Sequence, residues 1–174
     1  MTVFRRQGDL CVASFAPDEV QVLRKVASEV VGLLTEGFDR RDPVVGRLFP
    51  TVYPSDPAGS AEFRRYTETE LKTKKIDQAG AILAALPESG GAEVQLDDEA
   101  AEAWLRALTD ARLAMAIRLD ITAETDLGKE IEEAMRREPT SARAFQLSVY
   151  AYLGYLQESL LEALTAERSG ATGT

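Results

Sequence analysis

The chain has 174 residues, 45% of them hydrophobic, so it is long enough to bury one well-filled core. It carries 29 acidic against 20 basic side chains, a net charge of −9 that disfavours sequence-independent binding to nucleic-acid phosphates. A single cysteine, Cys11, excludes an intrachain disulfide. We find no signal-peptide pattern and no apolar run near the roughly 18 residues of a membrane span, which predicts a soluble, cytoplasmic protein.

The N-terminal segment predicts a β-hairpin followed by a helix. A Gly-Asp turn signal at positions 8–9 separates two segments of strand-like composition, 3–7 and 10–15. A proline and two acidic residues then open a helix, because proline suits the first helical position and acids suit the positive end of the helix dipole. Apolar residues recur at helical spacing from there to about Gly37.

The middle of the chain predicts two helices and a strand. Residues 42–50 can form a short helix that ends at a proline, and a loop follows. A long helix over 61–86 has a polar first half and an apolar second half. Segments 10–15 and 93–96 are both short, apolar and followed at once by acidic helix starts, so we predict that they pair in a sheet.

Three further helices complete the chain. They are predicted from Asp97 through 121, over the charged segment 127–138, and over 141–165, followed by a disordered tail at 166–174. The expected fold is mainly α, in one domain over 1–165. It is a bundle of about five to six helices with a small two- or three-stranded antiparallel sheet at one end.

The predicted central helix, "WLRALTDARLAMAIRLDI" from Trp104 to Ile121, is apolar nearly all round and still carries charges. Stepping 100° per residue places Arg112 within a stripe that includes Trp104, and Asp110 among the apolar residues of the opposite side. Residues two apart on a helix do not face each other, so each charge needs a partner from elsewhere. The other arginines of this helix could instead bury the aliphatic part of the side chain and extend the guanidinium into solvent, without a partner.

We expect the long helix 61–86 to supply these partners. Arg112 is predicted to be largely buried and bonded to a carboxylate, with Glu70 as the first choice, and Lys74 lies on the same side of that helix. Such ion pairs would fasten Asp110 and Arg112 to neighbouring helices. A carboxylate-based metal or acid–base site is the functional alternative.

The residue types present argue against most catalytic chemistry. The chain has no histidine, which removes histidine-based metal sites and catalytic triads, and it has no Gly-rich phosphate loop. Cys11 lies on a predicted strand and is expected to be a buried inert thiol, with a redox role as the alternative. We therefore expect no catalytic residue, no metal and no cofactor.

Charge is unevenly distributed along the sequence. Residues 88–138 contain 14 acidic against 6 basic side chains, which predicts an acidic surface that docks an electropositive protein. The candidate residues of this surface are Asp97, Asp98, Glu130, Glu132 and Glu133.

The nucleic-acid alternative rests on four bases of the long helix, which the helical spacing places on one face. Glu68 interrupts this face, and residues 60–80 have a net charge of only +1, so a solvated, salt-bridged face is favoured over direct contact with phosphates. The four bases are Arg64, Arg65, Lys72 and Lys75.

Three motifs carry a resemblance to a known family. The first comprises Trp104, Leu108, Asp110, Arg112, Leu113, Leu119 and Ile121. The second comprises Tyr152, Leu153, Leu156, Gln157 and Glu158, and the third is "DPVVGRLFPTVYPSD" at 42–56. With these motifs the chain resembles, over nearly its whole length, an actinobacterial family known as domain of unknown function two-zero-one-seven. The motifs are of a packing type and carry no chemistry.

The resemblance implies a regulatory role. A mycobacterial branch of the family is regarded as oxidative-stress transcriptional regulators that work with a stress sigma factor. A disulfide-based sensor would need two thiols, whereas this chain offers only Cys11. Two hypotheses stand: a regulatory adaptor that binds a protein of transcription or proteolysis, and a small-molecule-binding or enzymatic helical bundle. A packed core with acids on the surface would favour the first.

Overall fold

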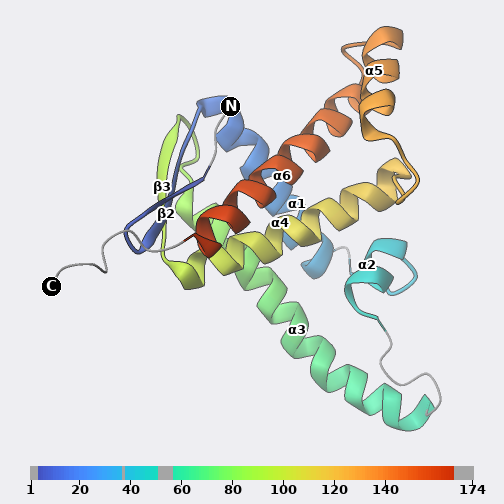
Figure 1. Ribbon diagram of the computed structural model, residues 1–174. Helices are drawn as coiled ribbons and strands as arrows, with labels where there is room; N and C mark the ends of the chain where they lie inside the picture. Colours follow the sequence, from blue (N-terminus) through green and yellow to red (C-terminus); the bar gives the residue numbers. More distant parts are fainter. Residues whose placement is uncertain (1–3, 37, 51–56, 167–174) are drawn as a thin grey trace, which may run out of the picture.

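The computed structural model describes residues 4–36, 38–50 and 57–166, without the side chains of 57–60, 63 and 64. Within these residues the chain forms six α-helices and one three-stranded sheet (Figure 1). The strands are β1 (Arg5–Gln7), β2 (Leu10–Phe15) and β3 (Ala92–Leu96). The helices are α1 (Pro17–Thr35), α2 (Pro43–Leu48), α3 (Pro57–Ala85), α4 (Asp98–Leu119), α5 (Leu127–Arg137) and α6 (Ala142–Thr165). The predicted fold class is confirmed.

The sheet is antiparallel in the order β1-β2-β3 and lies at one end of the bundle (Figure 1). The predicted pairing of β2 with β3 is confirmed, with Cys11 opposite Leu96 and Phe15 opposite Ala92. Gly91 precedes β3 in a position that only glycine fits, because a Cβ there would lie 2.8 Å from the Phe15 carbonyl oxygen.

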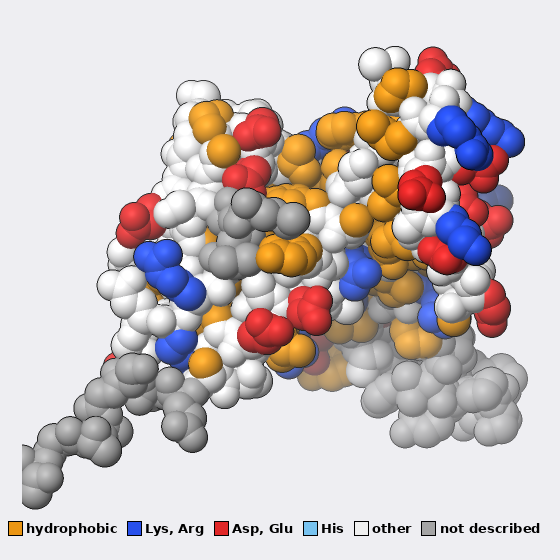
Figure 2. All heavy atoms as spheres, turned by 45° about the horizontal axis from the view of Figure 1, so that its top comes forward, with side chains coloured by type: hydrophobic (Ala, Val, Ile, Leu, Met, Phe, Trp, Pro, Cys, Tyr) orange, Lys and Arg blue, Asp and Glu red, His pale blue; other side chains and the backbone are white. Residues whose placement is uncertain are grey.

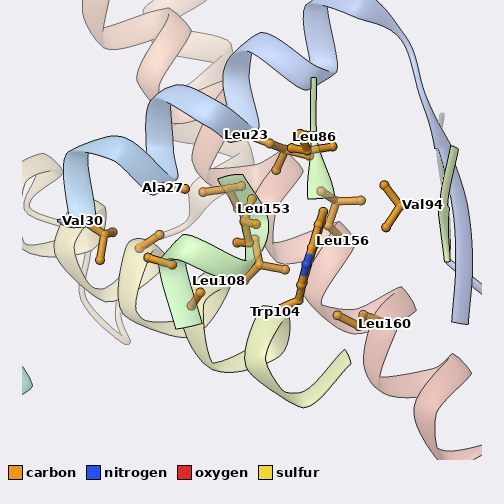
Figure 3. Packing of buried hydrophobic residues seen from close by; sticks show 14 of the residues in the cluster. Leu23, Ala27, Val30, Leu86, Val94, Trp104, Leu108, Leu153, Leu156 and Leu160 are labelled. Carbon is orange, nitrogen blue, oxygen red and sulfur yellow. The ribbon is translucent and has the colours of Figure 1, made fainter. Parts of the chain in front are cut away.

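Helix α4 runs through the centre and packs against α1, α2, α3, α6 and the sheet. Its Trp104 is fully buried and meets the rings of Phe4 and Phe15, with centroids 5.9 Å and 6.2 Å away. Figure 3 shows side chains of α1, α4 and α6 pointing toward one another beside this tryptophan. The stripe predicted from helical spacing is therefore the core-facing side of α4.

Two helices extend away from this core. The first half of α3 projects from the body beside α2, whereas its second half packs against α1 and α4 (Figure 1). This arrangement matches the change along α3 from polar to apolar residues. Helix α5 buries none of its residues and stands at the end of the molecule opposite the sheet, against the start of α6 (Figure 1). The tail predicted at 166–174 lies outside the described residues from position 167 onward.

Candidate functional site

Asp110 forms a buried ion pair with Lys75 of α3. The Lys75 ammonium donates to both carboxylate oxygens of Asp110, at 2.9 Å and 3.1 Å, and the two side chains are only 14% and 10% exposed. The expectation that the long helix supplies the partner of Asp110 is confirmed. The partner is Lys75 and not Lys74, because one residue further along a helix turns the side chain by about 100° toward α4.

The prediction that Arg112 pairs with Glu70 is wrong. Arg112 is half-buried, donates from Nη1 to Oε1 of Gln157 at 3.0 Å, and places its guanidinium 4.7 Å from the ring centroid of Tyr150. Both partners belong to α6, and Glu70 is exposed on α3. Arg112 lies two positions after Asp110, about 200° further round the helix, so the two side chains leave α4 on opposite sides and one neighbouring helix cannot contact both.

A glycine of α6 makes room for this arginine. A Cβ at Gly154 would lie 3.0 Å from Nη2 and 3.1 Å from Cζ of Arg112, closer than ordinary van der Waals contact. Gln157, one turn later, also donates to the hydroxyl of Thr109 on α4. The sequence signal for this contact was the Gly154–Gln157 spacing, since residues three apart share a helix face. Asp110 and Arg112 therefore join α4 to α3 on one side and to α6 on the other.

The acids predicted to form one surface are divided between two places. Asp97 caps α4 by accepting from the backbone of Ala100 at 2.8 Å, and Asp98 pairs with the buried side chain of Arg6 at 3.2 Å. The same arginine donates to the carbonyl of Leu164 at 3.0 Å and so ties the sheet to α4 and α6. Both acids at this end of α4 therefore stabilise the fold through contacts within the chain.

The remaining acids lie on α5, at the far end of α4 (Figure 1). Glu130 pairs with Arg143 of α6 at 3.1 Å and Glu133 pairs with Arg137 at 2.8 Å, whereas Glu132 is exposed. In Figure 2 Lys and Arg side chains are interspersed with Asp and Glu around this end. The two groups of acids therefore do not form one continuous acidic surface.

Cys11 is fully buried in β2. Burial raises the pKa of its thiol, an effect that the nearby Arg6 guanidinium partly opposes. A thiol in this setting holds its proton and is shielded from reagents, so its reactivity is low. The geometry favours the expectation of an inert thiol over the redox alternative.

An acid-rimmed cleft lies between the start of α1 and α6. It has a volume of about 220 Å³ and is lined by Asp18, Glu19, Val22, Phe145, Ser148, Val149 and Tyr152. The Tyr152 hydroxyl donates to Oε2 of Glu19 at 2.6 Å, and burial together with this bond raises the pKa of Tyr152. Phe145 is 53% exposed beside these groups. The cleft combines an apolar floor with carboxylates at its edge.

A second, open groove lies between residues 38–41 and α3, with a volume of about 960 Å³. Its lining residues are Phe38, Asp39, Arg40, Arg41, Arg65, Glu68, Thr69 and Lys72. Of the four bases predicted on one helix face, Arg65 and Lys72 line this groove. Lys75 points into the core toward Asp110, so the four bases do not form one face. The side chain of Arg64 lies outside the described residues.

Two further findings concern the described part of the chain. None of its helices has the length and apolar character needed to cross a membrane. Nor do its Cys, Asp and Glu side chains form a group of three or more with the geometry to hold a metal ion.

The fold and the interhelical charge contacts define a mainly helical protein with a small antiparallel sheet, in which Asp110 and Arg112 of the central helix join it to neighbouring helices. The chain belongs to a family described as a domain of unknown function (DUF2017), whose model matches residues 1–164.

Curated relatives come from mycobacteria. The "Putative oxidative stress regulator AosR" of Mycobacterium leprae is 30% identical, covering 87% of this chain and 81% of the relative. The "Oxidative stress regulator AosR" of Mycobacterium tuberculosis is 28% identical, covering 94% and 86%. No solved structure matches the chain significantly.

Proposed function

We propose that this protein is a cytoplasmic, non-enzymatic regulatory adaptor that acts in stress-linked transcription through protein–protein contacts. The observation that carries the proposal is the similarity, over 94% of the chain, to relatives named as oxidative stress regulators. The packing of Asp110 and Arg112 supports a regulator over an enzyme, because both charges are engaged in joining helices.

The acid-rimmed cleft is the contact surface that we assign to the partner protein. Exposed aromatic side chains in a cleft supply much of the binding energy of protein interfaces, and Phe145 has this position. Asp18 at the rim favours a basic partner by charge complementarity, whereas Glu19 accepts from Tyr152 and from the backbone of Ala16 and helps to shape the cleft. A volume of about 220 Å³ suits one or two side chains, so the partner would insert an apolar side chain that has a Lys or Arg next to it.

The proposal is tested by binding of the purified protein to promoter DNA and to a purified stress sigma factor, separately and together. The adaptor function requires binding to the sigma factor and DNA association that depends on it. Phe145→Ala should weaken the sigma-factor complex at least about tenfold, the loss typical of an interface anchor. Leu161→Ala, a matched change at a 48% exposed position of the same helix, should leave it intact.

Binding should also weaken with added salt, because exposed rim charges are screened. Tight, salt-sensitive binding to DNA by this chain alone would contradict the adaptor function. A sigma-factor complex that Phe145→Ala does not weaken would instead move the contact surface away from the cleft and leave the adaptor function standing.

A further inference from the structure

The groove between residues 38–41 and α3 concentrates positive charge in an acidic protein. Four bases and two acids line it, a local charge of +2, so the rest of the chain carries −11. Its α3 residues, Arg65, Glu68, Thr69 and Lys72, recur at the spacing of one helix face. The opposite wall comes from the segment that connects α1 to α2.

Both acids of the groove are already paired. Glu68 is 8% exposed and binds Arg40 at 3.0 Å, whereas Asp39 accepts from the backbone and the guanidinium of Arg41, which lowers the pKa of Asp39. Among the described residues neither Arg65 nor Lys72 forms an ion pair. Two cations therefore remain for an anion.

One of these cations is held in place by aromatic rings. The Lys72 ammonium lies 3.7 Å from the ring centroid of Phe38, an arrangement that attracts cations. Phe49 meets Phe38 edge to face, with centroids 5.3 Å apart, and so fixes the ring beneath the lysine. Because Lys72 is positioned before any ligand arrives, less side-chain entropy is lost when an anion binds.

We propose that this groove binds a small phosphorylated molecule carrying at least two negative charges. Arginine side chains match phosphate oxygens in a bidentate way, and a lysine adds a point charge. The volume of about 960 Å³ lies within the roughly 300–1,000 Å³ of small-molecule sites. The two unpaired bases and the volume of this groove match one small anion, whereas a nucleic acid would need a longer row of bases on a chain whose net charge is −9.

The assignment goes beyond the proposed adaptor function and does not depend on it. The test is isothermal titration of pyrophosphate, and separately of ATP, into the full chain at low salt. We expect saturable binding at one site by at least one of the two. Arg65→Gln and Lys72→Gln should each raise Kd at least about tenfold, because a lost charge-assisted hydrogen bond has that effect. Lys129→Gln, at an 83% exposed lysine on α5, is the matched control and should leave Kd unchanged.

Arg65 is exposed, so its replacement tests the site even if Lys72→Gln disturbs folding. Absence of saturable binding by both probes would overturn the proposal, as would binding that Arg65→Gln and Lys129→Gln weaken equally. A short DNA duplex that binds more tightly than pyrophosphate, with the same dependence on Arg65, would assign the groove to nucleic acid and contradict the small-anion assignment.

Discussion

The ion pair between Lys75 and Asp110 provides a direct test of how the central helix is fastened. Lys75→Met keeps most of the aliphatic stem and removes the charge, so that packing changes little. The carboxylate of Asp110, 10% exposed, then loses both of its short contacts to the ammonium. An uncompensated buried charge costs about 3–5 kcal/mol, which should lower Tm by roughly 10 °C in a domain of this size.

The measurement is urea denaturation followed by circular dichroism, on Lys75→Met, Asp110→Asn and the double variant. Because the second change removes the stranded charge, the double variant should recover part of the loss, with a coupling energy of at least about 1 kcal/mol. A loss below about 0.5 kcal/mol for Lys75→Met, or additive effects in the cycle, would refute the role of this pair in joining α3 to α4.

Three further outcomes are expected from the surroundings of Tyr152, Cys11 and Gly154. The pKa of Tyr152 is higher in the folded chain than its unfolded value of about 10, so its protonated hydroxyl contributes to stability below about pH 10 and this contribution falls as the pH rises above about 10. Urea melts of Tyr152→Phe should lack this fall. Cys11 should react with Ellman's reagent only as fast as the chain opens, and rapid labelling of the native protein would contradict its burial. In urea melts, Gly154→Ala should raise the free energy of unfolding by about 1 kcal/mol when it is introduced into Arg112→Ala, because alanine has the higher helix propensity. It should not do so in the natural chain, where the added Cβ meets the Arg112 guanidinium.

Periodicity in the sequence was sufficient for the elements and for the buried side of α4. It could not decide which neighbour faces which charge, since the rotation of two helices about their axes depends on all of their contacts. The long helix was correctly expected to supply a partner for Asp110, but the residue is Lys75, one position beyond the one considered. For Arg112 the small residue Gly154 marks the side where α6 approaches, a signal that counting charges does not detect.

The candidate surfaces were harder to predict because residues that are close in sequence can lie far apart in the fold, so a charged segment need not form one charged surface. Asp98 and Glu130 lie near opposite ends of α4, and a helix of 22 residues spans about 33 Å. Conversely, residues 38–41 and Lys72 are distant in sequence and share one groove. Glu68, which seemed to interrupt a basic face, is buried against Arg40 and helps to build that groove.

The cleft and the groove are separable in experiment because they use different parts of the fold. The start of α1 borders the cleft, and the segment that follows its end borders the groove; a helix of 19 residues places these ends about 28 Å apart. Phe145→Ala should therefore leave pyrophosphate binding unchanged in the titration, and Arg65→Gln should leave the sigma-factor complex unchanged without added anion. If either variant alters both activities, the two sites are coupled, and linkage then requires that the anion and the partner protein change each other's affinity by the same factor.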